Sequence, residues 1–459
     1  MLATRRIVSS SRAAGLRFAS TSASPDKFKV VVVGAGSGGL SVANQIYNRF
    51  QSAGKSLNSG DIAIIDAAEY HYYQPGWTLV GSGLRAKADT RKPLSSLIPK
   101  HISHIPENVK TFVPEKSSIV TTSGRTLSYD ALVVATGLQI NWNGIKGLSE
   151  ALLDSSSGVS SIYSYDTCDK VWNDIEALRS GNAIFTQPAG VIKCAGAPQK
   201  IMWMALDRFK QTSRAANIKV DFYTGMPTMF SVKKYSEVLN SLREQRGVGG
   251  FFQHNLIAID SANHKATFKK ADDTTVDVDY TTLHVTPPMG PLDFIKDSPI
   301  VDSAGWVQVD QATLQHVKPE YGNIFALGDC SSLPTSKTAA AIISQAPILT
   351  ENLFSVMDTG KVANAKYDGY TSCPVCFWSA RLLRTPPNDQ QLLTGYGELL
   401  LTEFKYGLEP KESFAWLDQG KPNRLFYHLK KDLFPAAYWN FMVKGRWFGV
   451  NGLSRPKFP

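Results

Sequence analysis

Hydrophobic runs separated by amphipathic stretches organise the first third of the chain. Residues 29–33 read Lys-Val-Val-Val-Val, which is typical of a strand buried on both faces, and 34–46 turn through glycines into a helical pattern. Apolar runs at 61–65 and 129–137 predict two further strands. The last of these ends in the small residues Ala-Thr-Gly, so we expect it beside the first strand, close to a ligand. Alternating strands and helices predict an α/β domain with a parallel sheet.

The same alternation begins again after about residue 150. A helical pattern covers 166–179, a strand pattern 182–186, a helical run follows residue 200, and another strand is expected at 219–224. Further on, 323–329 form a strand that ends in Gly-Asp. The sequence therefore predicts two Rossmann-like dinucleotide-binding domains, with the first interrupted by the second.

The expected organisation includes two terminal segments outside these domains, an N-terminal targeting segment and a C-terminal helical region. The apolar stretch 339–357 is interrupted by polar residues and a proline. A membrane-spanning helix needs about 18 or more uninterrupted apolar residues, so this stretch is expected to be a helix packed within the protein. The expected boundaries are 1–25 for the targeting segment, 26–150 for the first part of domain one, 151–300 for domain two, 301–360 for the return to domain one, and 361–459 for the C-terminal region.

The glycines after the first strand match the fingerprint G-x-G-x-x-G. Gly34 permits the tight turn, Gly36 lets the backbone approach a pyrophosphate, and Gly39 lets the helix pack closely on the strand. Asp66, at the end of the second strand, is placed to accept hydrogen bonds from ribose hydroxyls. The alternative is a glycine turn used only for packing. The strand–turn–helix context favours dinucleotide binding.

Residues at the ends of two further strands indicate which dinucleotide is bound. Thr136 and Gly137 end the strand expected beside the first, and Gly328 and Asp329 end the strand of the return segment. In flavoproteins with two dinucleotide-binding domains, such an aspartate holds the ribityl chain, whereas Gly-Asp alone would be an ordinary turn. Together with the glycine fingerprint, these residues predict FAD. The second domain has no G-x-G-x-x-G, and Cys194 stands where those glycines would be, which argues against NAD(P)H as reductant.

Charge and cysteine content indicate the cellular location of the protein and exclude some kinds of partner and site. The chain has 459 residues and a formal charge of +10, to which residues 1–25 contribute four arginines and no acid. That composition predicts a mitochondrial presequence, with a disordered basic tail as the alternative, and its removal leaves +6 (10 − 4). Such mild basicity does not indicate a nucleic-acid partner. Five cysteines provide neither a disulfide scaffold nor the paired C-x-x-C motifs of a zinc site.

Several longer motifs resemble the mitochondrial sulfide:quinone oxidoreductases, a family of disulfide-reductase-like flavoproteins. The resemblance covers nearly all of the chain after residue 25. Its most specific parts are Tyr73-Gln74-Pro75, Ile192-Lys193-Cys194-Ala195-Gly196-Ala197-Pro198-Gln199-Lys200, His284-Val285-Thr286-Pro287-Pro288, Pro334-Thr335-Ser336-Lys337-Thr338-Ala339-Ala340, and 367–374, which ends in Thr-Ser-Cys-Pro.

This resemblance implies a reaction. Cys194 and Cys373 would be a redox pair at the flavin; sulfide would attack their disulfide, leaving a persulfide on Cys373 and a thiolate on Cys194. The persulfide sulfur would pass to glutathione or sulfite, and electrons would pass through FAD to ubiquinone. Gln74 and Lys337, within the matching motifs, are expected at the cofactor. Lys193 is a candidate to lower the pKa of Cys194, with an ordinary surface lysine as the alternative.

The remaining cysteines have lesser expected roles. Some bacterial relatives attach FAD through an additional cysteine near the first domain, but no cysteine precedes Cys168 here, so FAD is expected to be non-covalent. Cys168 and Cys330 are interpreted as structural thiols.

One segment departs from the family pattern. The family runs from Thr-Ser-Cys-Pro almost directly into the motif at 392–396, whereas this chain inserts the 17 residues 375–391 (391 − 375 + 1). Cys373 and Cys376 form a C-x-x-C, but no thioredoxin-like context surrounds them. The insert is either a surface loop or a retained intron of 51 nucleotides (3 × 17), and its first and last residues can be encoded by splice signals. The intron is the preferred interpretation, and Cys376 is not counted as catalytic.

The C-terminal stretch 425–448 is rich in aromatic and basic residues. Six apolar side chains recur at helical spacing and predict an interfacial helix lying in lipid headgroups; these are Leu433, Phe434, Ala437, Tyr438, Phe441 and Met442. The alternative is a helix packed against the protein. Because a quinone dissolves in lipid, we expect monotopic attachment to the matrix side of the mitochondrial inner membrane, with Phe and Tyr side chains at the quinone entrance.

Two other functions remain open from sequence. A type II NADH:quinone oxidoreductase would share the two domains and the membrane surface, but would need phosphate-binding glycines near Cys194. A catalytically impaired flavin-binding isoform is the other possibility, if the insert 375–391 misplaces the neighbouring sulfur.

Overall fold

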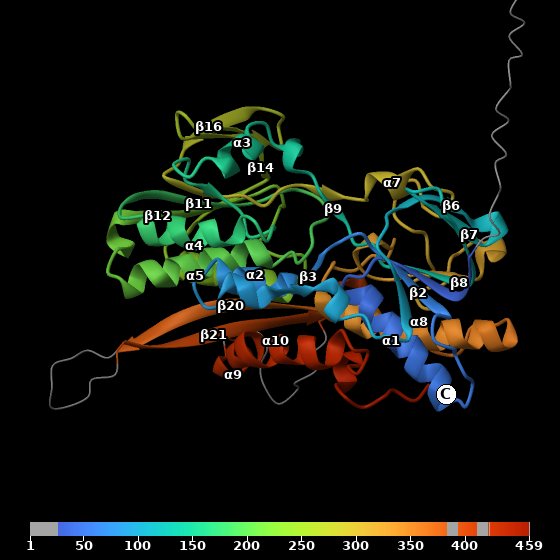
Figure 1. The fold of residues 1–459 in the computed structure, drawn as a ribbon. Coiled ribbons are helices and arrows are strands. Elements are labelled where there is room, and N and C mark those ends of the chain that lie inside the picture. The colour runs from blue at the N-terminus through green and yellow to red at the C-terminus, as the bar shows by residue number, and fades with distance from the viewer. Residues whose placement is uncertain (1–25, 383–392, 411–420, 422, 459) are drawn as a thin grey trace, which may run out of the picture.

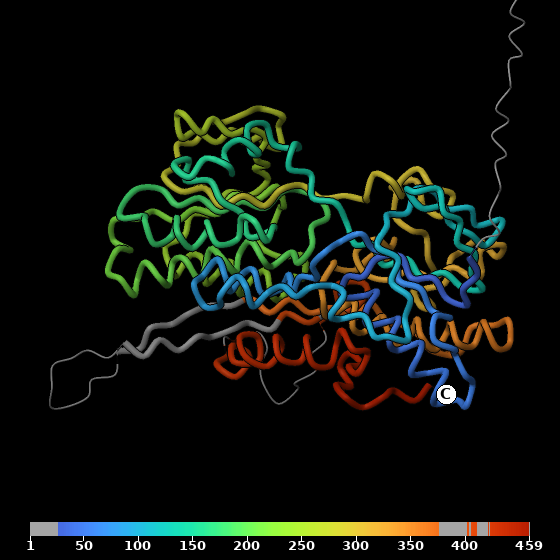
Figure 2. The backbone as a smooth tube through the Cα atoms, in the orientation of Figure 1, coloured from blue at the N-terminus to red at the C-terminus, as the bar shows by residue number. Residues whose placement is uncertain are grey.

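The computed structural model describes residues 26–382, 393–410, 421 and 423–458, with backbone alone for 376–382, 393–401 and 404. The expected presequence and residues 383–391 of the insert lie outside these ranges. Figure 1 shows two α/β lobes side by side, with a β-hairpin and the C-terminal helices beneath them. Figure 2 traces the chain from the first lobe through the second and back again.

The strands and helices have the following bounds. The strands are β1 (Asp26–Val33), β2 (Ile62–Ile65), β3 (Tyr70–Tyr72), β4 (Arg91–Pro93), β5 (Ile102–Ile105), β6 (Val109–Val113), β7 (Ser118–Thr121), β8 (Thr126–Val134), β9 (Gln139–Ile140), β10 (Val159–Ser160), β11 (Gly181–Gln187), β12 (Ile218–Thr224), β13 (Gly249–Phe252), β14 (His254–Asp260), β15 (Lys265–Lys270), β16 (Thr275–Asp279), β17 (Thr282–His284), β18 (Met289–Gly290), β19 (Ile324–Ala326), β20 (Thr371–Leu382) and β21 (Leu393–Phe404). The helices are α1 (Ser37–Ser52), α2 (Trp77–Val80), α3 (Leu148–Leu153), α4 (Cys168–Ala177), α5 (Ala197–Gln211), α6 (Lys233–Gln245), α7 (Asp293–Lys296), α8 (Ala339–Thr359), α9 (Arg424–His428) and α10 (Phe434–Ala437).

The first lobe is built on a parallel sheet centred on β1. β1 pairs with β2 on one side and β8 on the other, in the register Val32↔Ile64 and Val32↔Val133. The valines of β1 are buried because helices and loops cover both faces of the sheet. β19, from the return segment, pairs in parallel with the end of β8. The predicted interruption of the first domain is therefore confirmed.

The second lobe holds a parallel sheet in the order β10-β17-β11-β12-β13, with the antiparallel strands β14, β15 and β16 beside it. Its helix α5 is almost wholly buried, including Trp203, which has no exposed surface. The short strands β9 and β18 pair where the chain enters and leaves this lobe. The predicted fold class, two Rossmann-like domains with a C-terminal helical region, is confirmed.

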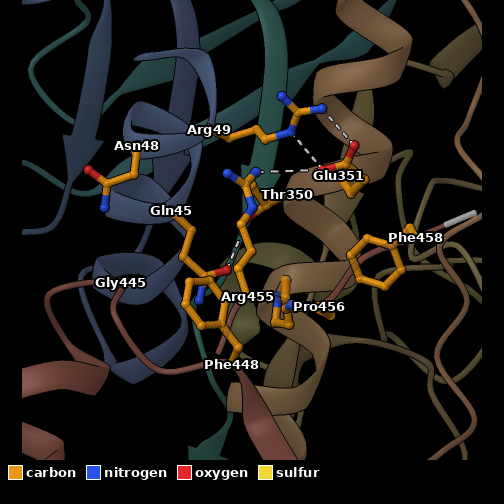
Figure 3. Close-up of a pocket in the computed structure, with 11 residues that line it drawn as sticks. Gln45, Asn48, Arg49, Thr350, Glu351, Gly445, Phe448, Arg455, Pro456 and Phe458 are labelled. Atoms are coloured by element: carbon orange, nitrogen blue, oxygen red, sulfur yellow. Dashed lines mark hydrogen bonds and ion pairs between the residues drawn. The ribbon is translucent and has the colours of Figure 1, made fainter. Parts of the chain in front are cut away.

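The C-terminal region attaches to both lobes. The hairpin of β20 and β21 packs against α5 through the start of β20. A helical run follows from α9 to residue 442, in which π-helical turns at Leu429–Leu433 and Tyr438–Met442 flank α10. Pro435 is the second residue of α10, which directly follows the first π-helical turn of this run. In the last residues, Arg455 joins the bidentate ion pair of Arg49 with Glu351 between α1 and α8 (Figure 3).

The C-terminal apolar stripe differs in part from the prediction. Ala437, Tyr438 and Met442 are buried against the first lobe, so these three residues do not form a lipid-facing surface in this structure. The packed-helix alternative is correct for them, because the inner face of the helix covers the first lobe. Leu433 is 47% exposed and Leu425 45% exposed. Within the described ranges, we find no helix with the length and hydrophobicity that crossing a bilayer requires.

Candidate functional site

Two cysteines from distant parts of the chain meet where the lobes and the hairpin converge. Cys194 lies in the connection between β11 and α5, and Cys373 lies in β20. Their sulfur atoms are 3.2 Å apart, although 179 residues separate them in sequence. Both are free thiols, Cys373 fully enclosed and Cys194 partly accessible. The arrangement permits thiol–disulfide exchange between them.

The backbone holds Cys194 in an unusual conformation. Its φ of +55° lies in the left-handed region, which a residue with a side chain seldom adopts. The Cys194 N–H donates to the carbonyl of Lys337 at 2.7 Å, and the Cys194 carbonyl accepts from Ala197 N–H at 2.7 Å. These bonds fasten the cysteine between the start of α5 and the segment before α8, and so direct its sulfur toward β20.

A glycine makes room for the second sulfur. A Cβ at Gly196 would lie 2.6 Å from the Cys373 sulfur, well inside contact distance. The Cys373 carbonyl accepts a hydrogen bond from Thr402 Oγ1 at 2.6 Å across the hairpin. At the start of the strand, the hydroxyls of Thr371 and Thr338 are 2.8 Å apart, which ties β20 to the N-terminus of α8. The side chain of Cys376 lies outside the described residues.

A buried lysine contacts both sulfurs. Lys200 Nζ is 3.0 Å from the Cys194 sulfur and 3.3 Å from the Cys373 sulfur, and the residue is 2% exposed. Lys193 has a different partner: its Nζ donates to Gln74 Oε1 at 2.8 Å. The expectation that Lys193 would stabilise the thiolate is corrected by this geometry, because the first turn of α5 carries Lys200 to the sulfurs instead.

The electrostatics distinguish the two cysteines. The hydrogen bond from Cys373, together with the positive charge of Lys200, holds the pKa of Cys194 well below its usual range despite burial. The same hydrogen bond, with burial and the charge of Cys194, raises the pKa of Cys373 well above that range. Cys194 is therefore the more acidic of the two thiols. Burial raises the pKa of Cys168 to about 12, as expected of an unreactive thiol.

The glycine turn after β1 has the geometry that its sequence predicts. Gly34 has φ +96°, and a Cβ there would lie 2.6 Å from the Ala135 carbonyl; a Cβ at Gly39 would overlap the Gly34 carbonyl. At Gly36, by contrast, a Cβ would meet nothing within 4 Å, so this side of the turn is open. Asp66 Oδ2 accepts a hydrogen bond from Ala35 N–H at 2.6 Å.

The other predicted cofactor residues gather at the carboxyl ends of β8 and β19. Thr136 and Gly137 follow β8, and Gly137 has φ +75° with open space where a Cβ would stand. Gly328 N–H donates to Gln345 Oε1 at 2.8 Å. Asp329 Oδ1 is buried without a hydrogen-bond partner among the described residues. Such an orphaned acceptor fits the hydroxyls of a bound ribityl chain.

Lys337 lies beside this orphaned carboxylate. Its Nζ donates to the Ser331 carbonyl at 2.6 Å, and burial lowers its pKa while the charge of Asp329 raises it. A cavity of about 390 Å³ adjoins the Cys194 loop. It is lined by Gln187, Gly190, Val191, Ile192, Ala195, Met226, Thr228, Met229, Phe230, Ser231, Trp306, Ser331, Ser332, Leu333, Pro334, Thr335, Ser336, Lys337, Lys405 and Leu408.

A dinucleotide-binding domain beside an exchange-competent cysteine pair defines a flavin-dependent disulfide oxidoreductase. The family model for pyridine nucleotide-disulphide oxidoreductases matches residues 28–177. The mitochondrial sulfide:quinone oxidoreductase of Schizosaccharomyces pombe is 50% identical over 96% of this chain and 95% of its own length. That of Dictyostelium discoideum is 46% identical over 93% of this chain and 88% of its own length.

The chain belongs to the mitochondrial sulfide:quinone oxidoreductase family, and the resemblance noted in the sequence is confirmed. The solved sulfide:quinone oxidoreductase of Aquifex aeolicus has the same fold, with a TM-score of 0.66 at 17% identity over 90% of this chain and 92% of that one.

Proposed function

We propose that this protein oxidises hydrogen sulfide at Cys194 and Cys373 and passes the electrons through FAD to ubiquinone. Membership of the sulfide:quinone oxidoreductase family supports the overall reaction. The observation that carries the assignment to these residues is the 3.2 Å approach of the two sulfurs, with Lys200 in contact with both.

The proposed cycle begins from the disulfide. Hydrosulfide attacks the Cys373 sulfur, the disulfide bond breaks, and Cys373 carries a persulfide while Cys194 leaves as a thiolate. The lowered pKa of Cys194 makes it the better leaving group, and Lys200 stabilises the negative charge that forms. Transfer of the outer sulfur to a nucleophilic acceptor leaves Cys373 as a thiolate. Loss of two electrons from the two thiolates then restores the disulfide.

FAD, held non-covalently, fits the residues that surround the pair. Gly34, Gly36 and Gly39 would hold its pyrophosphate and Asp66 its ribose, whereas Thr136, Gly137, Gly328, Asp329, Gln74 and Lys337 would contact the flavin half. When bound, FAD supplies a two-electron acceptor next to Cys194. Gln74 is linked to Lys193 from the other lobe, so this contact would close the two lobes around the cofactor.

The cavity beside the Cys194 loop supports a small anionic sulfur acceptor, glutathione or sulfite. Its wall includes Lys337 and Lys405, the hydroxyls of Thr335 and Ser336, and the apolar ring of Trp306. Lys405 Nζ lies 3.2 Å from Glu409, so only part of its charge is available to a ligand. The polar and cationic wall favours an acceptor that carries negative charge next to its nucleophilic sulfur.

The names of its relatives support a mitochondrial location, and we place the protein on the matrix side of the inner membrane as a peripheral protein. The exposed Leu425 and Leu433 of the C-terminal helical run, with Lys431 and Arg424 near them, offer an apolar and cationic surface for lipid headgroups. This surface replaces the full stripe expected from the sequence. Ubiquinone would then reach the flavin from the lipid side.

Anaerobic titration of the purified holoprotein with sulfide and, separately, with NADH tests this function. In the presence of sulfite as sulfur acceptor, sulfide is expected to bleach the flavin, because both cysteines can then become thiolates and pass on two electrons. Added ubiquinone is expected to restore the colour, and NADH is not expected to bleach the flavin. Bleaching by NADH alone would instead support a type II NADH:quinone oxidoreductase. A flavin that neither reagent reduces would support a catalytically impaired flavin-binding isoform.

A further inference from the structure

A buried tyrosine from the C-terminal helical run makes hydrogen bonds at the dinucleotide turn of the first lobe. The Tyr438 hydroxyl is 2.6 Å from Ser37 Oγ and 2.6 Å from His71 Nε2. On its other side, His71 Nδ1 is 2.9 Å from the Ala35 carbonyl. Tyr438 is separated from Ser37 by 401 residues, so the contact depends entirely on how the C-terminal helices pack.

The chemistry of the partners determines the direction of each hydrogen bond. The Ala35 carbonyl can only accept, so His71 Nδ1 carries a proton and donates it. Burial lowers the pKa of His71, which keeps the ring neutral and leaves Nε2 as an acceptor. The Tyr438 hydroxyl therefore donates to Nε2, and its oxygen accepts the proton of Ser37 Oγ. The result is a continuous chain from Ser37 through Tyr438 and His71 to Ala35.

This chain holds both neighbours of Gly36. The Ala35 carbonyl is bound by His71, and the Ala35 N–H is bound by Asp66 at 2.6 Å. Ser37, at the first position of α1, is bound by Tyr438. Gly36 between them is exposed and faces open space. The peptide group before the open position and the side chain after it are thus held by side chains from elsewhere in the fold.

Packing holds the tyrosine itself in place. Tyr438 is 1% exposed, and its ring lies 4.6 Å from that of Tyr73 and 5.8 Å from that of His71, measured between centroids. Trp439 contacts the same two rings. An aromatic cluster from the start of the chain and the end of the chain therefore positions the hydroxyl, with little freedom to move away from the turn.

We propose that Tyr438 is a positioning residue that shapes the glycine turn for the pyrophosphate of FAD. The inference rests on the FAD assignment in the proposed function. A turn already held in its bound shape loses less conformational freedom when the cofactor binds, and so binds it more tightly. The packing of the C-terminal helices therefore contributes to the affinity of the first lobe for FAD.

The test compares Tyr438→Phe with Tyr427→Phe. Both remove one hydroxyl from a buried tyrosine of the same helical run, but Tyr427 packs with Leu79, Met204 and Phe426, in a separate cluster from the turn. Apoprotein is prepared from the wild type and both variants, and the dissociation constant for FAD is measured by fluorescence quenching. The melting temperature of each apoprotein is measured alongside.

Tyr438→Phe is expected to weaken FAD binding roughly tenfold, because a buried acceptor and a buried hydroxyl lose their partner. Tyr427→Phe is expected to stay within about twofold of the wild type. Excess FAD is expected to restore sulfide-driven bleaching in Tyr438→Phe, and its apoprotein is expected to melt close to the wild type. A clearly lowered melting temperature would assign the weaker binding to a destabilised fold and overturn the positioning role. Equal FAD affinity in Tyr438→Phe and the wild type, or equal weakening in both variants, would overturn the proposal.

Two further outcomes are informative. Should Tyr438→Phe fail to accumulate, Ser37→Ala removes the other end of the same hydrogen bond without disturbing the C-terminal packing. Weaker FAD binding in Ser37→Ala supports the proposal, and unchanged binding overturns it. If the wild-type apoprotein itself binds no FAD, the cofactor assignment fails, and the proposal fails with it.

Discussion

Substituting Gly196 with alanine tests the close approach of the two sulfurs. The backbone at Gly196, with φ −90° and ψ −5°, is ordinary for alanine, so the change introduces no conformational strain. The added Cβ would lie 2.6 Å from the Cys373 sulfur and 3.2 Å from Val375 Cγ2. Ordinary contact begins at 3.4 Å, so the sulfur must retreat by about 0.8 Å (3.4 − 2.6).

That displacement acts directly on the exchange step. The sulfurs would move from 3.2 Å toward about 4 Å, and a misplacement of about 1 Å costs up to roughly two orders of magnitude in rate. We expect sulfide-driven bleaching to slow by between about 10-fold and 100-fold. Overpacking adds a stability cost of about 1–3 kcal/mol, which leaves a folded protein at room temperature.

Stopped-flow mixing of the oxidised holoprotein with sulfide and sulfite, without oxygen, measures this rate. Gly290→Ala is the matched control, because a Cβ at Gly290 would meet nothing within 4 Å and its φ is not positive. The control is expected to retain the wild-type rate and flavin content. A wild-type rate in Gly196→Ala would refute the reasoning, since it would show that the sulfur pair tolerates displacement.

Four further predictions concern Lys200, Cys168, Glu351 and the segment 375–391. Lys200→Met is expected to raise the pKa of Cys194 and to shift the pH profile of Cys194 alkylation to higher pH. An unshifted profile would show that Lys200 does not stabilise the Cys194 thiolate. Cys168→Ser is expected to keep sulfide-driven bleaching within about twofold, because its thiol has a pKa of about 12 and lies outside the pair; a large loss would contradict this. The hydrogen bond from Arg49 lowers the pKa of Glu351, so Glu351→Gln is expected to reduce the free energy of unfolding by about 1 kcal/mol at neutral pH, measured with denaturant. In acid below that lowered pKa, the wild type and the variant are expected to be equally stable. A stability difference that persists in acid would exclude the ion pair as its source. Because the family pattern joins Thr-Ser-Cys-Pro almost directly to the motif at 392–396, a variant without 375–391 is expected to bleach at least as fast as the full chain, although 375–382 extend β20 in this structure. Slower bleaching would show that these residues belong to the working site.

The fold was largely predictable because its signals are local. Four consecutive valines predict a strand buried on both faces, and β1 occupies the centre of the first sheet as that pattern requires. Gly34 and Gly39 have roles that depend only on the backbone next to them. β19, which Gly328 and Asp329 follow in the next turn, was recognisable for the same reason.

What the sequence could not predict are contacts between side chains far apart in the chain. Lys193, next to Cys194 in sequence, was the natural candidate to stabilise the thiolate, but the loop turns its side chain toward Gln74. Lys200 reaches the sulfurs because it lies in the first turn of α5. The sequence showed that Lys200 belongs to the motif around Cys194, but it did not show that the side chain contacts the sulfurs. The C-terminal stripe was equally ambiguous, because an apolar helix face looks the same whether it meets lipid or protein.

The most direct test of the account is to locate the sulfur atom after sulfide has reacted once with the protein in the absence of a sulfur acceptor. The oxidised holoprotein would receive one equivalent of sulfide in the absence of oxygen, followed by an alkylating reagent, protease digestion and mass spectrometry. The account predicts one additional sulfur atom on the peptide that contains Cys373 and an alkylated thiol without added sulfur at Cys194. Added sulfur on Cys194, or on neither cysteine, would contradict it.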